Sequence, residues 1–265
     1  RRMGNKQITT NKRMNGFRFE VCANGVESCL AAQEGGADRV ELCAGIPEGG
    51  TTPSYGEIKV ARKLLSSTQL NVIIRPRGGD FLYSPLEIER MKEDITICKE
   101  LGADGVVFGC LTEEGTVDMD KNRQLMECAK GMSATFHRAF DRTIDPFRAM
   151  EDIISLGCDR ILTSGQQPKA INGTSLLAQL QEKADGRIIL LAGSGVTEDN
   201  IRQIYEETKI HEYHFSARTS VASKMKNICS NVYMGAKGAD EQNILVTDAD
   251  RVRATIMQLK EACKQ

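Results

Sequence analysis

Eight short β-rich runs, each followed by a stretch with helical periodicity, limit the folds open to this chain more than any other sequence feature. The runs recur about every 28 residues and begin near Phe17, Arg39, Asn71, Gly105, Ser133, Arg160, Arg187 and His211. Apolar residues at three- and four-residue spacing predict helices over Val26–Glu34, Tyr55–Leu65, Pro85–Leu101, Lys121–Ala129, Asp145–Leu156, Ser175–Lys183, Thr197–Glu207 and Asp248–Cys263. Strands that are joined through helices run parallel, so the pattern predicts an α/β fold with a parallel sheet.

The number of strand–helix units favours one architecture. Eight units in a chain of 265 residues match a single-domain TIM (β/α)8 barrel. A doubly wound open sheet is the alternative, but no GxGxxG follows the first predicted strand. We assign residues 17–265 to the barrel, and the polar residues 1–16 to a disordered arm or an added tag.

A repeated turn supports the barrel. The segments GGADRVEL (35–42), LGADGVVFG (101–109) and LGCDRILTSG (156–165) share Gly-x-Asp ahead of a hydrophobic run. Glycine suits the left-handed end of a helix, and Asp can hydrogen-bond the turn that follows. We therefore expect these turns to have a structural role, at the barrel face opposite the active site.

The composition excludes several classes of protein. The 35 basic and 36 acidic residues give a net charge of −1, which argues against nucleic acid or a membrane surface as a partner. No apolar run approaches the roughly 20 residues of a membrane span. The nine cysteines are odd in number and form no CxxC, so neither a disulfide framework nor a zinc site is indicated. We expect reduced cysteines and a cytoplasmic location.

Polar residues gather where the predicted strands end, which in TIM barrels is the face that carries the active site. A Glu–Arg network that only closes the barrel is the structural alternative, because charges inside a barrel must be paired. If these polar residues instead form a ligand site, it combines acid–base groups with arginines and glycine-rich loops, which suit an anionic ligand. The acid–base candidates are Glu20, Glu41 and His137, and the ligand-binding candidates are Arg75, Arg77, Asp80, Arg138, Gly193, Gly195, Ser216 and Arg218.

The last third of the chain adds to this picture. The segment AGSGV (192–196) opens the seventh predicted helix, at the usual phosphate position of a barrel. His211 and His214 lie three residues apart on the last strand, so they face different ways and do not form a chelating pair. Residues 218–247 are predicted to be a long loop that forms a lid or an oligomer contact.

Two cysteines stand apart because each belongs to an E-x-C unit at a strand end. Side chains alternate along a strand, so Glu20 and Cys22 share one face of the first strand, and Glu41 and Cys43 share one face of the second. These strands are neighbours in a barrel, which predicts both thiols at the same height. Adjacent thiolates suit a soft metal such as Cu(I). Two ordinary core cysteines are the alternative.

Several segments resemble the CutC family: FEVCANGVES, GGADRVELCAGIPEGGTTPS, IRPRGGDFLYS, FHRAFD, LTSG and EYHFSAR, in this order from about residue 17. The resemblance implies a cytoplasmic TIM barrel with a role in copper homeostasis. It also implies bound Cu(I), with Cys22 and Cys43 as ligands, and a homodimer or homotetramer. The residues by themselves leave a second hypothesis open, an enzyme that acts on a small anionic or phosphorylated metabolite at the same barrel face.

Overall fold

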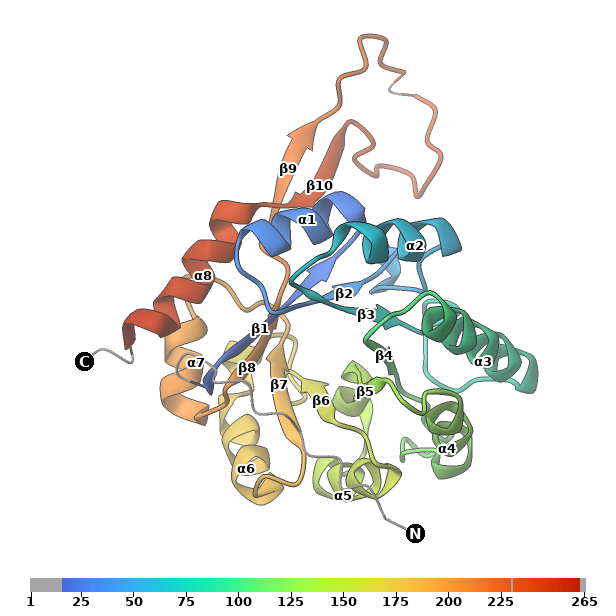
Figure 1. Ribbon diagram of the computed structural model, residues 1–265, viewed down its shortest axis with the longest axis vertical. Coiled ribbons are helices and arrows are strands. Elements are labelled where there is room, and N and C mark those ends of the chain that lie inside the picture. Colours follow the sequence, from blue (N-terminus) through green and yellow to red (C-terminus); the bar gives the residue numbers. More distant parts are fainter. Residues whose placement is uncertain (1–15, 230, 263–265) are drawn as a thin grey trace.

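Eight parallel strands close into one barrel in sequence order in the computed structural model, which describes residues 16–229 and 231–262 (Figure 1). The strands are β1 (Arg18–Ala23), β2 (Arg39–Leu42), β3 (Gln69–Ile73), β4 (Gly105–Phe108), β5 (Ser133–Phe136), β6 (Arg160–Thr163), β7 (Ile189–Gly193) and β8 (Glu212–Phe215). β1 pairs with β8, so the sheet has no free edge. The predicted single-domain TIM barrel is confirmed.

Helices surround the barrel as the strand–helix rhythm predicts (Figure 1). They are α1 (Val26–Glu34), α2 (Tyr55–Leu64), α3 (Pro85–Glu100), α4 (Met119–Cys128), α5 (Pro146–Leu156), α6 (Thr174–Ala184), α7 (Ile201–Thr208) and α8 (Ala249–Ala262). Three short 3-10 helices, η2 (Ile46–Glu48), η3 (Arg138–Arg142) and η4 (Ala170–Asn172), lie in loops. None of the helices in the described part of the chain has the length and apolarity needed to cross a lipid bilayer.

Side-chain caps set where helices begin. In α3, the Ser84 hydroxyl accepts a hydrogen bond from the Glu87 amide, and the Glu87 carboxylate accepts one from the Ser84 amide. The Asp118 carboxylate accepts from the Lys121 amide, so α4 begins two residues before the predicted start. The seventh helix begins at Ile201 rather than directly after the glycine-rich segment, because a turn occupies the intervening residues.

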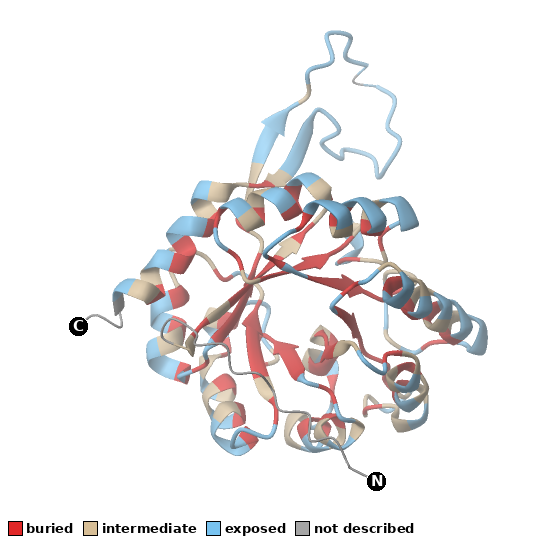
Figure 2. Cartoon of the chain, viewed as in Figure 1, coloured by how far each residue is buried: buried red, intermediate tan, exposed pale blue. Residues whose placement is uncertain are grey.

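The strands are buried on both sides, as Figure 2 shows in red for most of each strand. In β2, Val40 and Leu42 belong to the hydrophobic core, whereas Arg39 and Glu41 alternate with them and are buried polar residues. The closed sheet thus places apolar side chains against the helices and charged side chains in the barrel interior. These charges are available for the site.

The Gly-x-Asp turns have the predicted structural role. Each Asp carboxylate accepts a hydrogen bond from a backbone amide in another strand: Asp38 from Phe19, Asp104 from Leu70 and Asp159 from Ala134, at 2.8–2.9 Å. The three turns therefore tie neighbouring strands together where those strands begin, at the face opposite the site.

The strand register corrects one expectation. In the pairing of β1 with β2, Cys22 lies opposite Glu41 and Glu20 lies opposite Arg39, so the two E-x-C units are offset by two residues. The prediction that the two units lie side by side with both thiols at the same height is therefore wrong for the backbone pairing, since the residue opposite Cys22 is Glu41 and not Cys43. Residue alternation gives the face of a strand but not its stagger against its neighbour.

Residues 218–247 are not one long loop. They contain an antiparallel pair, β9 (Arg218–Ala222) and β10 (Asn243–Thr247), which extends away from the barrel (Figure 1). We call residues 218–247 the arm. Figure 2 shows that most of it is exposed, and its exposed large apolar residues are Val221, Met225, Ile228, Val232, Tyr233, Met234, Ile244 and Leu245. Residues 1–15 of the predicted N-terminal arm, and Cys263, lie outside the described residues.

Candidate functional site

A cavity of about 840 Å³ opens where the barrel strands end. It is lined by residues from many parts of the chain, including eight of the predicted site residues: Cys22, Glu41, Arg75, His137, Arg138, Gly195, Ser216 and Arg218. The other five, Glu20, Cys43, Arg77, Asp80 and Gly193, are not part of this lining. The predicted convergence of polar residues at one mouth is therefore real, although some of them support the cavity rather than form it.

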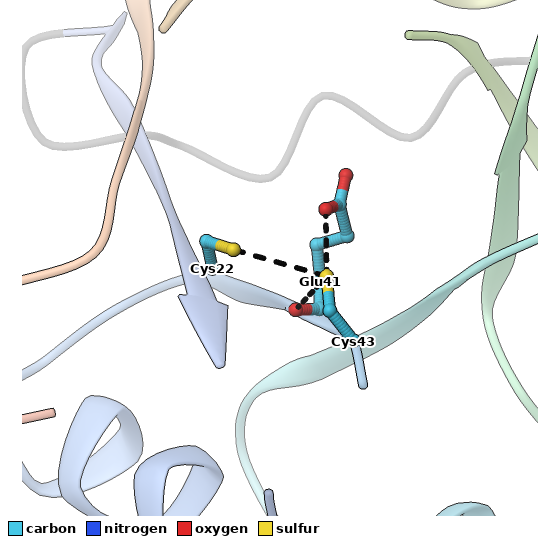
Figure 3. A group of neighbouring side chains, drawn as sticks. All are labelled: Cys22, Glu41 and Cys43. Carbon is cyan, nitrogen blue, oxygen red and sulfur yellow. Dashed lines mark hydrogen bonds between the residues drawn. The ribbon is translucent and has the colours of Figure 1, made fainter. Parts of the chain in front are cut away.

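The two cysteines of the E-x-C units point toward each other, with Glu41 beside Cys43 (Figure 3). The Cys22 and Cys43 sulfurs are 3.8 Å apart, and the Glu41 carboxylate accepts a hydrogen bond from the Cys43 thiol at 3.0 Å. Cys22 is half-buried and lines the cavity, whereas Cys43 is only 2% exposed. On the other side, an Arg218 guanidinium nitrogen lies 3.2 Å from the Cys22 sulfur.

Behind Cys22 lies a buried chain of charged groups. His214 Nδ1 is 2.6 Å from one Glu20 oxygen, and Arg39 Nε donates to the other at 2.5 Å. Arg39 also pairs with Glu212, which pairs with Arg160. The Glu–Arg network considered as the structural alternative is therefore present in the barrel interior. It coexists with the cavity, because His214 belongs to both.

These contacts change the acidity of the groups around the thiols. The hydrogen bond from Cys43 and the nearby His214 and Arg218 hold the pKa of Cys22 well below its ordinary value of 9.0, against burial. The pKa of Cys43 is raised by Cys22 and by burial. Burial is outweighed at His214, whose pKa rises well above 6.5 because of Cys22 and Glu20. Both shifts favour the charged forms, a thiolate at Cys22 and an imidazolium at His214.

Two predicted acid–base residues have unequal surroundings. Burial raises the pKa of Glu41 from 4.5 to about 7, and one Glu41 oxygen has no hydrogen-bond partner among the described residues. Glu20 is fully buried, and Arg39 and His214 overcome that burial to lower its pKa. Glu41 is therefore able to exchange a proton near neutral pH, whereas Glu20 stays ionised and holds His214.

The third acid–base candidate, His137, is a neutral imidazole. Its Nδ1 accepts a hydrogen bond from the Ala139 amide at 3.1 Å. Burial and the charge of Arg75 lower its pKa from 6.5 to about 3. Its Nε2 lacks a partner within the described structure, and its ring packs 5.0 Å from that of Phe81. Because Nδ1 accepts this bond, the neutral ring carries its proton on Nε2, so His137 can donate a hydrogen bond to a ligand without carrying a charge at neutral pH.

The predicted arginines of the β3 loop mainly organise loops. Arg75 is buried and donates to the backbone carbonyls of Glu48, Gly50 and Gly79. Arg77 pairs with Asp80 and with Glu87 at the start of α3. The predicted carboxylate or phosphate contact at Arg77 has no counterpart in the cavity lining, because its guanidinium already holds acidic side chains and loop carbonyls.

Arg138 reaches the cavity in company with an acid. The Asp141 carboxylate pairs with Arg138 at 2.8 Å and accepts hydrogen bonds from Thr163 and Ser164. Asp141 thereby joins the loop after β5 to the loop after β6. Arg142, the next residue, is exposed at the cavity and stacks on Phe81 with its guanidinium carbon 5.7 Å from the ring centre.

The glycine-rich segment after β7 gives the cavity its remaining wall. Gly193 packs closely, since a Cβ there would lie 2.5 Å from Leu162 Cδ1 and 3.2 Å from the His214 side chain. Gly195 has a φ of +66° and turns the chain into the lining. At this end Arg251 pairs with Glu198 at 3.1 Å, so the predicted anion position also contains a carboxylate.

Sequence reasoning missed His214, Arg142, Asp141 and Arg251 as site residues. His214 could have been identified from its position at the end of the eighth predicted strand. Its contact with Glu20 could not, because the two residues are 194 positions apart in the sequence. Asp141 and Arg142 lie at the end of the same short helix, η3, that begins at the predicted residue Arg138. Their contribution depends on contacts with other loops, which local patterns do not contain.

The model of the CutC family matches residues 17–219, about three-quarters of the sequence. The chain belongs to the CutC family. A Bacteroides thetaiotaomicron protein named family protein CutC is 61% identical over 248 residues, which are 93% of this chain and 100% of the relative. The human protein named copper homeostasis protein cutC homolog is 48% identical over 240 residues, or 90% of this chain and 88% of its own length.

Solved structures agree with this assignment. CutC from Streptococcus agalactiae superposes with a TM-score of 0.73 at 35% identity, covering 76% of this chain and 98% of that chain. Phosphoribosyl anthranilate isomerase from Thermotoga maritima has a TM-score of 0.56 at 14% identity and covers 92% of this chain and 99% of its own, which shows the fold alone. The CutC family match ends at residue 219, so nearly all of the arm lies beyond it.

Proposed function

We propose that this CutC family member serves copper homeostasis by binding Cu(I) through Cys22 and Cys43. The observation that carries the proposal is the 3.8 Å separation of the Cys22 and Cys43 sulfurs, of which Cys22 lines the cavity and Cys43 lies buried beside it. Two metal–sulfur bonds of about 2.3 Å each, the length known for zinc, span at most about 4.6 Å, so one ion can contact both sulfurs. Two thiolates without an imidazole ligand are a soft donor set, which suits Cu(I). The relative named copper homeostasis protein supports the same role.

The surrounding charges suit Cu(I) bound by two thiolates. Such a unit carries one net negative charge, which the His214 imidazolium and the Arg218 guanidinium offset. The Cys43 proton must leave when the metal binds. Glu41 lies 3.0 Å from that sulfur and has a pKa of about 7, so it can accept this proton. The free thiols of all eight described cysteines suit a reducing compartment, and we assign the protein to the cytoplasm.

An anaerobic Cu(I) titration against a chromogenic chelator tests this proposal. We expect about one Cu(I) per chain in the unaltered protein, and loss of that site in Cys22→Ser and in Cys43→Ser. Cys128→Ser is the matched control, because Cys128 is also half-buried but lies outside the cavity. Unchanged stoichiometry and affinity in the Cys22→Ser/Cys43→Ser double variant would refute the proposal.

A second candidate function is catalysis on a small anionic metabolite. The observation that favours it is the size of the cavity, about 840 Å³, with Arg142 exposed on its wall. One metal ion does not need so large a polar cavity. Thermal-shift measurements with phosphorylated metabolites test it: we expect stabilisation that is weaker in Arg142→Ala. If none of the phosphorylated and carboxylated metabolites tested raises the melting temperature of the protein, this function is contradicted.

We also propose that the arm contributes to a homodimer or homotetramer. Its eight exposed large apolar side chains extend beyond the barrel, and solvent-exposed apolar groups of this extent commonly mark an interface. The two-stranded sheet in the arm is open at its edges, where another strand can pair.

A further inference from the structure

The Phe81 ring, in the loop between β3 and α3, gathers three nitrogen-bearing side chains at the cavity. The ring centre of His137 lies 5.0 Å from that of Phe81. The guanidinium carbons of Arg75 and Arg142 lie 5.2 and 5.7 Å from the same ring centre. All four residues line the cavity, and we call them the Phe81 cluster. The cluster shares no residue with the proposed copper site.

Arg75 carries a buried charge that forms no ion pair with any described carboxylate. Only 6% of the residue is exposed, and its side chain donates to three backbone carbonyls rather than to an acid. One of these carbonyls belongs to Glu48, but the Glu48 carboxylate itself does not pair with Arg75. Buried guanidinium groups are normally paired with an anion, so this charge favours a negatively charged ligand nearby.

Arg142 adds a second unpaired charge to the cluster. Its guanidinium contacts the Phe81 ring, but it forms neither a hydrogen bond nor an ion pair with another residue in the described part of the chain. By contrast, Arg138 and Arg251, which also line the cavity, are each paired with a carboxylate. Arg142 is exposed, so a ligand in the cavity can reach its N–H groups.

His137 supplies a hydrogen-bond donor that the protein does not use. It is 4% exposed, and its Nε2, which carries the proton, has no partner among the described residues. Burial and the charge of Arg75 lower its pKa to about 3, so the ring stays neutral. A buried N–H group without an acceptor costs free energy, which an acceptor oxygen on a ligand would recover.

We propose that the Phe81 cluster binds the carboxylate group of a small organic acid, with Arg142 and His137 Nε2 as hydrogen-bond donors. Arg75 contributes charge but no free pair of donors, since its terminal nitrogens already bond to backbone carbonyls. One imidazole N–H and one guanidinium match the two oxygens of a carboxylate. A phosphate has more oxygens to satisfy and is commonly held by backbone amides at a helix N-terminus.

The usual phosphate position of a barrel supports this distinction. That position, at Gly195 after β7, contains the carboxylate of Glu198, which is paired with Arg251. Arg75 and Arg142 instead follow β3 and β5. The acid group of a ligand is therefore expected on the β3–β5 side of the cavity rather than beside the glycine-rich turn.

This inference rests on the second candidate function and narrows its ligand to an acid whose carboxylate lies at the Phe81 cluster. The two ideas fail separately. Carboxylates that bind at the cluster but are never converted leave this inference intact and remove catalysis. A phosphorylated metabolite that is converted equally well without Arg142 and without the His137 donor supports catalysis and removes this inference.

Calorimetric titration of the metal-free full chain with benzoate, succinate and phenyl phosphate tests the proposal. Benzoate and phenyl phosphate share a ring and differ in the acid group. We expect about one benzoate per chain, bound at least about 10-fold more tightly than phenyl phosphate. Arg142→Ala should weaken benzoate binding at least about 10-fold. Arg148→Ala is the matched control, because Arg148 is also exposed but lies outside the lining of this cavity.

The role of His137 is tested by His137→Asn. The amide oxygen of asparagine can replace Nδ1 as the acceptor for the Ala139 amide, whereas the Nε2 donor is lost. We expect benzoate binding to weaken at least about 10-fold, with thermal unfolding as the check that the variant is folded. If it does not fold, nitrogen NMR of the unaltered protein decides, since the chain has only three histidines. Benzoate must then shift the His137 Nε2 signal.

Four results would overturn the proposal. The first is that neither benzoate nor succinate binds, and the second is that phenyl phosphate binds as tightly as benzoate. The third is benzoate binding that is unchanged in Arg142→Ala. The fourth is unchanged binding in folded His137→Asn or, where NMR decides, a His137 Nε2 signal that benzoate does not move.

Discussion

Glu41 is a buried carboxyl that the fold tolerates at a cost, and we expect Glu41→Gln to stabilise the protein above neutral pH. One carboxylate oxygen accepts from Cys43, and the other has no partner in the part of the chain that the structure describes. A glutamine of similar shape keeps an acceptor for the thiol and removes the charge. Ionised Glu41 therefore destabilises the fold relative to the amide.

The magnitude follows from the pKa of Glu41, which burial raises from 4.5 to about 7. The folded state holds this proton more tightly than the unfolded state. The fold thus loses stability as the pH rises from about 4.5 to about 7, and it is unaffected by this group below that range. The difference of about 2.5, at about 1.4 kcal/mol per pKa unit, amounts to about 3.5 kcal/mol once Glu41 is fully ionised in the folded state.

Urea unfolding of the metal-free protein at about pH 4 and about pH 8 measures this effect. We expect nearly equal free energies of unfolding for the unaltered protein and Glu41→Gln at the lower pH. At the higher pH the variant should be more stable by about 3 kcal/mol. Glu48→Gln, at an exposed carboxyl of the same cavity, controls for the loss of a negative charge. A stability gap that does not widen between the two pH values would refute the reasoning.

Three further predictions concern the fold and the assembly. Asp141→Ala breaks the junction between the loops after β5 and β6, and urea unfolding should show a loss of about 3 kcal/mol. A loss under about 1 kcal/mol would mean that water replaces the carboxylate. Ser84→Ala removes the capping box of α3 and should lower the free energy of unfolding by about 1 kcal/mol. An unchanged free energy of unfolding would show that the cap is dispensable. Replacing residues 223–242 by a short turn should lower the mass found by sedimentation equilibrium to that of a monomer. An unchanged oligomer would exclude the arm as the interface.

The barrel could be predicted because its evidence is local. Each strand is a short buried run, each helix has its own apolar period, and eight repetitions leave few architectures. The Asp residues of the Gly-x-Asp turns are likewise local signals, since each acts beside the start of a strand. The arm was not predicted as a strand pair. Its strands are largely exposed and contribute little apolar burial, so their pattern is weak.

The face of the site was also predictable, but its contacts were not. Both cysteines lie at or just after strand ends, which puts them at the cavity end of the barrel, and alternation puts them on the interior face; their sulfurs are 3.8 Å apart. The register that sets Cys22 opposite Glu41 depends on how the whole barrel closes. For the same reason, residue spacing alone could not distinguish Arg77, which pairs with Glu87 of α3, from Arg218, which lies against the Cys22 sulfur.

The clearest case is the pair of histidines near the last strand. Their spacing correctly indicates that they do not chelate one ion: His211 is exposed and stacks on Phe17, whereas His214 is buried. Spacing cannot show that His214 lies opposite Glu20, because only the pairing of the first strand with the last brings them together. The lowered pKa of Cys22 depends on the same pairing of β1 with β8, since His214 lies in β8 and Arg218 lies just after it. The chemical character of the site is therefore a property of the closed barrel, and any variant that loosens the β1–β8 pair should weaken Cu(I) binding at Cys22 and Cys43.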